Sequence, residues 1–195
     1  MTTHLVQTAT MDDKAAVLAI LTLAFSSDPA TRWTWPDPKA YLEAFPHFAI
    51  AFGGAAFARG SAHRVGAAAA ALWLPPGSEP DDAALMDLFQ RTADAATAED
   101  GPRIMQQMAG YHPQEPHWYL PLIGTDPAHQ GSGVGGALLR HAAGLCDRDG
   151  VPAYLESSNP RNIPFYQRHG FEVLGRIQSG RSPVITPMLR RPGRR

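Results

Sequence analysis

Four glycines lie close together in the last third of the chain, in the segment Gln130-Gly131-Ser132-Gly133-Val134-Gly135-Gly136. A glycine-rich turn that leads into a helix presents unpaired backbone N–H groups and the positive end of the helix dipole, and both attract phosphate or pyrophosphate. Glycine also lets a ligand approach the backbone closely and permits positive φ angles. The segment therefore predicts a site for a phosphate-bearing ligand, with a flexible glycine-rich turn as the alternative.

Three kinds of phosphate loop use glycine-rich turns, and the sequence distinguishes between them. A Walker loop needs a lysine after the glycines, and none follows here. The spacing of Gly131, Gly133 and Gly136 matches the Gly-x-Gly-x-x-Gly pattern of a dinucleotide-binding turn. Glu156, 20 residues after Gly136, matches the acidic residue that such a site needs. However, five residues, Pro127 among them, separate the expected strand from Gly131, whereas a dinucleotide turn follows its strand at once. The remaining interpretation is a loop that binds the pyrophosphate of an acyl-CoA.

A second block follows further along the chain, Asn159-Pro-Arg-Asn162-Ile-Pro-Phe-Tyr166-Gln-Arg-His-Gly170-Phe171. Together with the glycine segment, it resembles the GCN5-related N-acetyltransferase (GNAT) family, whose signature Gln/Arg-x-x-Gly-x-Gly/Ala stands here from Gln130 to Gly135. The resemblance is strongest over roughly 115–175. It implies an α/β fold with a mixed, strongly twisted sheet flanked by helices, acetyl-CoA as the acyl donor, and no metal.

The resemblance also implies which residues bind the cofactor. The strand over 117–125 would hold the pantetheine arm through its backbone and separate from its neighbour to admit it, and Gly124 suits a β-bulge there. Ser132 stands where the family often carries Lys or Arg, so the pyrophosphate would depend more on backbone amides. Asn159 would contact the pantetheine arm or serve in a turn, and Asn162 would bind the cofactor or cap the next helix. The expected cofactor-binding residues are Ile123, Gly124, Thr125, Gln130, Gly131, Ser132, Gly133, Val134, Gly135, Gly136, Asn159 and Asn162.

Two residues are candidates for proton transfer. Amide formation from a thioester needs a neutral amine and a proton for the departing thiolate. Tyr166 matches the tyrosine that supplies this proton in the family, and its ordinary pKa of about 10 keeps it protonated at neutral pH; a core tyrosine is the alternative. Glu156, at the end of an expected strand, is the candidate base, unless it pairs with an arginine such as Arg32 or Arg161.

Other side chains have weaker claims to a role in the site. His112 and His117 are alternative bases, and Cys146, on a mostly apolar stretch, is expected to be a buried, inert thiol. The segments 28–32, 116–120 and 151–156 are similar to the puromycin N-acetyltransferases of the same family, which implies a small-molecule primary amine as acceptor. A flat acceptor would need an aromatic wall, and the candidates for it are Trp33, Trp35, Trp73, Trp118 and Tyr119.

These side chains must be positioned by alternating helices and strands, which predict an α/β domain. We expect strands over 5–9, 67–74, 117–125, 152–157, 171–177 and 184–189. Helices are expected from residue 10 to before Pro29, over 39–52, after Asp81 or Asp82, after Pro102, over 133–148 and over 163–169. The segment 28–36 is expected to be a loop, and the alanine-rich strand 67–74 requires tight packing because alanine has poor strand propensity.

Composition narrows the class of protein. The 195 residues carry 17 basic and 18 acidic side chains, a balance that argues against a nucleic-acid partner. The stretch 67–74 is far shorter than the roughly 20 apolar residues that cross a bilayer, and 1–13 lacks the features of a secretion signal. The single cysteine excludes a disulfide framework and a cysteine-built zinc site. We therefore expect one cytoplasmic domain over 1–195, with a solvated basic tail at 190–195 and no membrane partner. A homodimer is one oligomeric state that the family resemblance allows.

The predicted function is the transfer of an acetyl group from acetyl-CoA to a primary amine of a small molecule, antibiotic-like acceptors included. A non-catalytic acyl-CoA-binding regulatory protein of the same fold is one alternative. A nicotinamide-dependent oxidoreductase is the other, because the glycine spacing also matches a dinucleotide turn.

Overall fold

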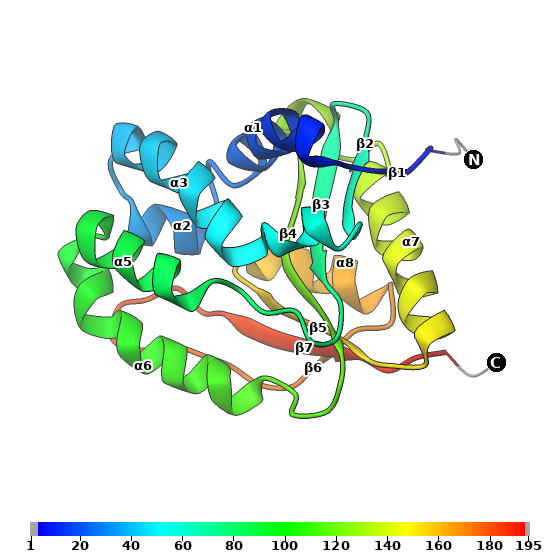
Figure 1. Cartoon of the computed structure of the whole chain (residues 1–195). Coiled ribbons are helices and arrows are strands. Elements are labelled where there is room, and N and C mark those ends of the chain that lie inside the picture. The colour runs from blue at the N-terminus through cyan, green and yellow to red at the C-terminus, as the bar shows by residue number, and fades with distance from the viewer. Residues whose placement is uncertain (1–3, 194–195) are drawn as a thin grey trace.

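The computed structural model describes residues 4–193, whose strands form one mixed sheet (Figure 1). The strands are β1 (Gln7–Thr8), β2 (Ala62–Val65), β3 (Ala69–Leu74), β4 (Trp118–Thr125), β5 (Ala153–Ser157), β6 (Glu172–Val173) and β7 (Thr186–Arg190). Their order across the sheet is β1-β2-β3-β4-β5-β7-β6. The pair β4 and β5 is parallel, and the other neighbours are antiparallel. The expected α/β fold with a mixed sheet flanked by helices is confirmed.

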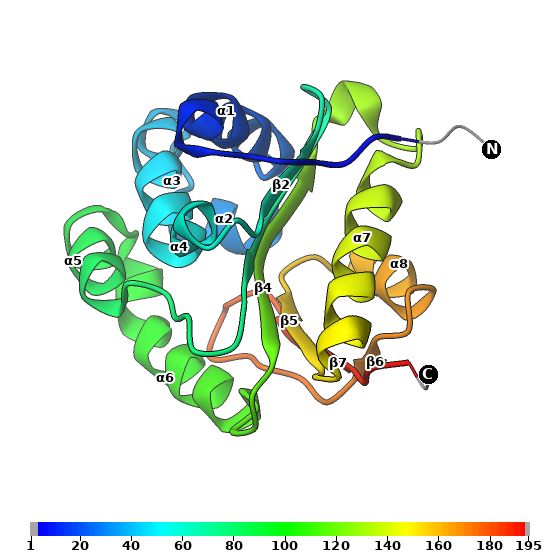
Figure 2. The same cartoon turned by 45° about the vertical axis from the view of Figure 1, so that its right-hand side comes forward.

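Helices cover both faces of this sheet (Figure 2). They are α1 (Lys14–Ala24), α2 (Pro29–Thr34), α3 (Pro38–Gly53), α4 (Ala55–Ala58), α5 (Asp82–Thr92), α6 (Ala95–Tyr111), α7 (Val134–Asp149) and α8 (Ile163–Gln167), with 3-10 turns at Met11–Asp13, Pro127–His129 and Pro160–Asn162. One apolar core lies under α1 and α3 and includes Tyr119 and Tyr154. The second lies under α7 and α8 and includes Leu138 and Tyr166. The site residues are therefore divided between two faces of one sheet.

The alanine-rich strand lies in the middle of the sheet. Ala69, Ala70 and Ala71 are fully buried, with β2 and β4 on either side and helices on both faces. The predicted tight packing of these alanines is confirmed. The strand is shorter than expected, because Gly66 has a φ of +52° within a turn that folds β2 back against β3.

Two local predictions were wrong, one at a helix start that a cap and an N-terminal proline favour, and one at a helix that packing maintains through an internal proline. The segment expected to be a loop contains α2, which Asp28 caps by accepting hydrogen bonds from the N–H groups of Ala30 and Thr31, with Pro29 at the first helical position. The helix expected only after Pro102 begins at Ala95 and runs through that proline.

The C-terminal tail also differs from expectation at its first residue. Arg190 is the last residue of β7, and its guanidinium group makes two 2.8 Å hydrogen bonds to the carboxylate of Asp147 on α7. This bidentate ion pair fastens the end of the sheet to α7. The expectation of a solvated end at Arg190 was wrong, and Arg194 and Arg195 lie outside the described residues. No helix within residues 4–193 is long and apolar enough to cross a membrane.

Candidate active site

The parallel strands β4 and β5 separate soon after they begin to pair. Their ladder contains the pairs Trp118–Ala153 and Tyr119–Tyr154, while β4 continues to Thr125 without a partner on that side. The separation opens the sheet between the two helical layers. The predicted splaying of this strand from its neighbour is confirmed.

The glycine segment forms the turn between β4 and α7. Gly131 and Gly133 have φ angles of +79° and +89°, in the left-handed region where a side chain would be strained. Before them, the carboxylate of Asp126 accepts a 2.9 Å hydrogen bond from the N–H of Ala128 and fixes the start of the turn. These features give the loop a defined shape in the folded chain.

Several N–H groups of this turn are free to bind a ligand. Within the described chain, the first N–H of α7 to be hydrogen-bonded is that of Ala137, which donates to the carbonyl of Gly133. Five N–H groups of this turn have no hydrogen-bond partner among residues 4–193. They belong to Gly131, Gly133, Val134, Gly135 and Gly136. These donors and the dipole of the 16-residue helix make an anion-binding site.

Glycine at the start of α7 also keeps space open between three elements. A methyl group on Gly135 would lie 3.1 Å from Oγ1 of Thr125 on β4 and 3.7 Å from Phe165 on α8. A methyl group on Gly136 would lie 3.1 Å from the guanidinium group of Arg140 and 3.5 Å from Nε2 of His169. Side chains here would thus intrude between the helix and its neighbours.

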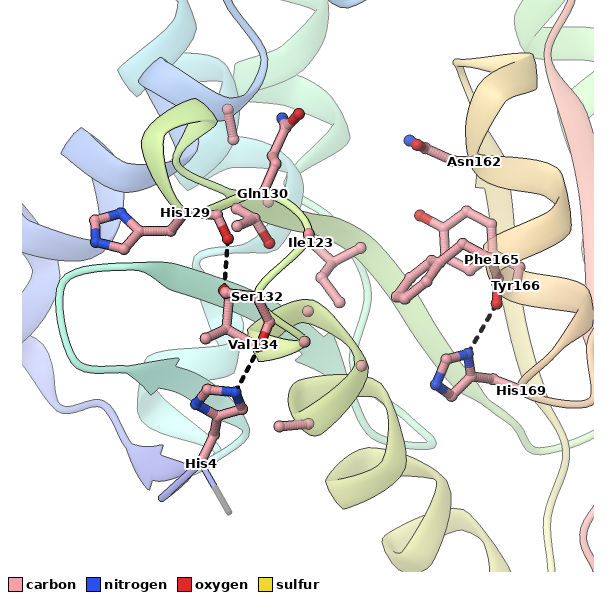
Figure 3. Close-up of a pocket in the computed structure, with 18 of the residues that line it drawn as sticks. His4, Ile123, His129, Gln130, Ser132, Val134, Asn162, Phe165, Tyr166 and His169 are labelled. Carbon is pink, nitrogen blue, oxygen red and sulfur yellow. Dashed lines mark hydrogen bonds between the residues drawn. The ribbon is translucent and has the colours of Figure 1, made fainter. Parts of the chain in front are cut away.

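A cleft of about 1480 Å³ brings the predicted cofactor residues together (Figure 3). In Figure 3, Ile123 and Gln130 lie across the cleft from Asn162 and Tyr166. The predicted residues that line it are Ile123, Gly124, Thr125, Gln130, Gly131, Ser132, Gly133, Val134, Gly135, Gly136, Asn159, Asn162 and Tyr166. Thus every predicted cofactor-binding residue and the candidate acid border one cavity.

Glu156 borders a second, smaller cavity between the separated strands. This cavity has a volume of about 40 Å³ and is walled by Leu120 and Pro121 of β4 and by Leu155 and Glu156 of β5. Tyr166 lines both cavities. The candidate acid therefore lies between the large cleft and the candidate base.

Tyr166 is buried, with 6% of its surface exposed, and its ring packs against Phe165 and Phe171. Its hydroxyl group makes no hydrogen bond to any residue in 4–193. Burial, with the nearby negative charge of Asp28, raises the pKa of Tyr166 well above its ordinary value. The hydroxyl therefore stays protonated over the physiological range and is available as a hydrogen-bond and proton donor.

Glu156 makes its one side-chain hydrogen bond with a tyrosine. The hydroxyl of Tyr119 on β4 donates to Oε2 of Glu156 over 2.7 Å. Burial raises the pKa of the Glu156 carboxyl group to about 7, and the hydroxyl groups of Tyr119 and, to a lesser extent, of Tyr154 act in the opposite direction. Among the described residues no arginine forms an ion pair with Glu156, so the alternative of an arginine partner was wrong.

His112 and His117, the two alternative bases, lie close to the tyrosine that binds Glu156. The ring of His112 makes edge-to-face contacts, with centroids 5.0 Å away, to both Tyr119 and Tyr154. The Nε2 atoms of His112 and His117 are 3.0 Å apart. Burial lowers the pKa of His112 to about 4, with a further contribution from His117. Neither histidine lines either cavity, whereas Glu156 lines the smaller one.

The two asparagines have different local roles. The side chain of Asn159 accepts a 3.1 Å hydrogen bond from the N–H of Arg161, which is the turn role that was one of its two alternatives. Asn162 stands at the N-terminus of α8, but its side chain makes no capping hydrogen bond, so that alternative was wrong. Both side chains border the cleft.

Basic side chains around the cleft were missed by sequence reasoning. They come from α7 after the glycines, from the turn before α8 and from the residues that follow α8, and are Arg140, His141, Arg161, Arg168 and His169. Ser132 lines the same cleft at the position where the family often carries a basic residue, and its hydroxyl donates a 2.6 Å hydrogen bond to the carbonyl of His129. Only the spacing of Arg140, one helical turn beyond Gly136, gave a sequence signal.

Asp28 is a further cleft residue that sequence reasoning did not single out. Besides capping α2, its carboxylate accepts a 2.6 Å hydrogen bond from the hydroxyl of Ser158, which follows β5. Burial raises the pKa of Asp28. This contact joins the start of α2 to the end of β5 beside the candidate acid.

Two predictions near the site were wrong. Gly124 pairs in regular register with Ala70, and the irregularity of this ladder lies between the Leu72–Leu122 and Leu74–Tyr119 pairs. Gly124 is needed for another reason, since a methyl group there would lie 2.5 Å from Cβ of Ala24 on α1. The expected aromatic wall is also absent from both cavities, whose lining includes none of Trp33, Trp35, Trp73, Trp118 and Tyr119.

Cys146 is the one cysteine of the chain and lies on α7. Its thiol is fully buried, and burial raises its pKa to about 12. The predicted burial of this thiol is confirmed, and its lack of reactivity stays a prediction.

Comparison with known proteins gives the family. A model described as Acetyltransferase (GNAT) family matches residues 29–171. The chain is 36% identical over 78 residues to an uncharacterized N-acetyltransferase of Schizosaccharomyces pombe, a match that covers 38% of this chain and 32% of that protein. It is 40% identical over 58 residues to the mycothiol acetyltransferase of Brachybacterium faecium, covering 28% of this chain and 18% of that protein. These matches span less than half the length of either relative.

Solved structures match over the whole length. A structure from Corynebacterium glutamicum, described as histone acetyltransferase HPA2 and related acetyltransferase, has 28% identity and a TM-score of 0.69, with 100% of this chain and 99% of that chain covered. Arylalkylamine N-acetyltransferase 2 from Aedes aegypti shares the fold, with a TM-score of 0.61 at 10% identity over 98% of this chain and 100% of that chain. Because the family match covers most of the chain and includes the glycine loop and Tyr166, this protein belongs to the GNAT family of acetyltransferases.

Proposed function

We propose that this chain is an N-acetyltransferase that moves the acetyl group of acetyl-CoA to a primary amine of a small molecule. One observation carries the proposal: five unpartnered N–H groups of the glycine loop and the Tyr166 hydroxyl line the same cleft. The N–H groups and the basic side chains beside them suit a pyrophosphate. Membership of the GNAT family supports acetyl-CoA as the donor.

The residues divide the chemistry between them. Bound acetyl-CoA supplies a thioester, whose acetyl carbon forms the new bond to nitrogen while the carbon–sulfur bond breaks. Glu156 takes a proton from the amine so that the nitrogen lone pair is free. An N–H of the strand over 122–125 donates to the carbonyl oxygen and stabilises its negative charge. Tyr166 gives its proton to the sulfur, which leaves as a thiol.

The raised pKa values of both residues suit these roles. A carboxyl group with a pKa of about 7 is a stronger base than an ordinary glutamate and still ionised in part at neutral pH. Tyr166 has its pKa raised and so cannot lose its proton prematurely. The pair therefore supplies one acceptor and one donor of protons at the same pH.

The acceptor is the least constrained part of the proposal. We favour a small-molecule amine because segments 28–32, 116–120 and 151–156 resemble puromycin N-acetyltransferases, which makes aminonucleosides the first acceptors to try. The name of the Corynebacterium glutamicum structure includes histone acetyltransferase, so a protein amine is the second choice. The buried thiol of Cys146 is compatible with a reducing cytoplasm.

Calorimetric titration of the purified chain with acetyl-CoA tests the cleft. We expect saturable binding at one site per chain, weakened by a Gly133→Ala substitution and absent with NAD. Saturable NAD binding without acetyl-CoA binding would overturn the proposal in favour of an oxidoreductase.

Release of free thiol in the presence of amines tests catalysis. Puromycin and a panel of other primary amines, and then a lysine-containing peptide, should be compared with acetyl-CoA alone. Acetylation of an added amine would support the enzyme. Tight acetyl-CoA binding with no transfer to any amine would instead favour the non-catalytic acyl-CoA-binding protein.

A further inference from the structure

Tyr119 bridges the gap between the separated strands. It occupies the last position at which β4 and β5 pair, opposite Tyr154, and Glu156 lies two residues further along β5 on the same face. The Tyr119 side chain reaches from β4 to Oε2 of Glu156 over 2.7 Å. The bond therefore forms where the two strands diverge.

The phenol ring of Tyr119 is held on several sides. It stacks on Tyr154 with centroids 5.9 Å apart, and it meets Phe52 and His112 edge to face at 5.8 Å and 5.0 Å. Only 4% of Tyr119 is exposed. Because the ring has a fixed place, its hydroxyl also has a fixed place, and so has the carboxylate oxygen that accepts from it.

The second carboxylate oxygen of Glu156 has a different environment. Oε1 accepts no hydrogen bond from any residue in 4–193, and Glu156 lines the small cavity that adjoins Tyr166. Binding of Oε2 by Tyr119 thus leaves one oxygen occupied and the other open to the cavity.

We propose that Tyr119 is a positioning residue for Glu156. The Tyr119 hydroxyl holds Oε2 of Glu156, turns Oε1 toward the acceptor amine and favours the ionised carboxylate. The inference rests on the proposed function only in assigning the amine proton to Glu156. A donor to a carboxylate stabilises the charged form, and here it opposes the effect of burial on the pKa of Glu156. Without the hydroxyl, a larger fraction of Glu156 would be protonated and unable to act as a base at neutral pH.

Other titratable groups around this pair come from three elements. Tyr154 lies beside Glu156 on β5, Tyr111 of α6 interacts with Tyr154, and Asp82 of α5 interacts with Tyr119. His112, which follows α6, packs on both tyrosine rings. Tyr119 donates the 2.7 Å hydrogen bond to the carboxylate, and Tyr154 also lowers the pKa of Glu156, to a lesser extent.

A matched pair of variants isolates the hydroxyl of Tyr119. Tyr119→Phe keeps the ring and removes the donor. Tyr154→Phe removes the neighbouring buried hydroxyl, which lowers the pKa of Glu156 less than Tyr119 does and makes no hydrogen bond of ordinary geometry within residues 4–193, and so serves as the comparison. Both keep their aromatic packing, and a thermal unfolding curve verifies that each variant folds.

The test is an NMR titration of the chain labelled with ¹³C at the glutamate carboxyl carbon. The sequence has six glutamates, and the resonance that titrates near pH 7 is assigned to Glu156 by its loss in Glu156→Gln. We expect Tyr119→Phe to raise the midpoint by about one pH unit, as loss of a charge-assisted hydrogen bond would. Tyr154→Phe should raise it by less than Tyr119→Phe does, because the Tyr154 hydroxyl is the weaker of the two groups that lower the pKa of Glu156.

Activity gives a second readout. The pH midpoint of the acidic limb of kcat/KM for the amine should shift to higher pH in Tyr119→Phe by the same amount. The KM for acetyl-CoA should be unchanged. Equal midpoints in Tyr119→Phe and the wild type would overturn the positioning role. Because the titration needs no turnover, a shifted midpoint without acetyl transfer to any amine would disprove the proposed function while leaving the hydrogen-bond inference intact.

Discussion

The substitution Glu156→Gln should change how stability depends on pH. Glutamine has the shape of glutamate, and its carbonyl oxygen can accept the same hydrogen bond from Tyr119. The variant removes only the ionisation. Since the Glu156 pKa is about 7 in the folded chain, against 4.5 for an ordinary glutamate, the folded state holds this proton more tightly than the unfolded state.

The sign and size of the effect follow from that difference in pKa. Below the unfolded pKa, both states are protonated and the stabilising contribution is complete. As pH rises through the folded pKa of about 7, the contribution is lost. The gap between the two values sets an upper limit of about 3 kcal/mol, and contact with the water-accessible cavity reduces the expected loss to about 1–3 kcal/mol.

Urea unfolding of both proteins from pH 5 to pH 8.5 measures this loss. His63 and His112, whose pKa values are lowered to about 4 mainly by burial, act in the opposite direction, because their contribution is lost as pH falls. Both histidines are present in both proteins, so they cancel in the difference. The free energy of unfolding of wild type minus variant should fall by about 1–3 kcal/mol between pH 5 and pH 8.5.

A difference that stays constant over this range would refute the reasoning. It would mean that the Glu156 carboxyl group has an ordinary pKa in the folded chain and that solvent reaches it freely. The proposed role as a base with a matched pKa would then lose its physical ground, whatever the activity of the variant.

Three further substitutions test other parts of the site. Tyr166→Phe should lower turnover at least about tenfold while leaving the Kd for acetyl-CoA unchanged, and unaltered turnover would remove Tyr166 from the mechanism. Gly133→Ala, at a φ of +89°, should lower stability by about 1–2 kcal/mol and weaken acetyl-CoA binding, whereas Gly144→Ala, in the open part of α7, should do neither. Cys146→Ala should keep full activity, and the wild-type thiol, with a pKa of about 12, should resist iodoacetamide at pH 7.5; rapid labelling would contradict its burial.

The parts of the fold that could be predicted depend on neighbouring residues. The glycine loop and the start of α7 are encoded within a few positions, because left-handed glycines and a helix N-terminus are local features. The cap of α2 is equally local, since Asp28 followed by Pro29 is a helix start, and expecting a loop there overlooked that signal. The helix through Pro102 had no such signal, because the packing of buried Asp100 and Ile104 against the rest of the chain maintains it.

The pairing of Tyr119 with Glu156 could not be predicted from either residue. The two lie 37 positions apart, and their contact depends on the register of β4 against β5 and on where those strands diverge. A slip of one residue would place Glu156 on the opposite face. The sequence identified the carboxylate as a candidate base, but only the sheet shows which side chain would set its charge.

Ser132 gives the same lesson for the cofactor loop. A sequence comparison within the loop suggests that a cation is lost there, and hence that the pyrophosphate depends on backbone amides. In the folded chain, Arg140 of α7 and Arg168 and His169 at the end of α8 line the same cleft. Arg140 and Arg168 therefore supply positive charge from outside the loop motif. Affinity for acetyl-CoA should then fall with rising salt concentration, because salt screens the attraction between charged side chains and phosphate groups. The fall should be larger than it would be if neutral backbone amides alone bound the pyrophosphate.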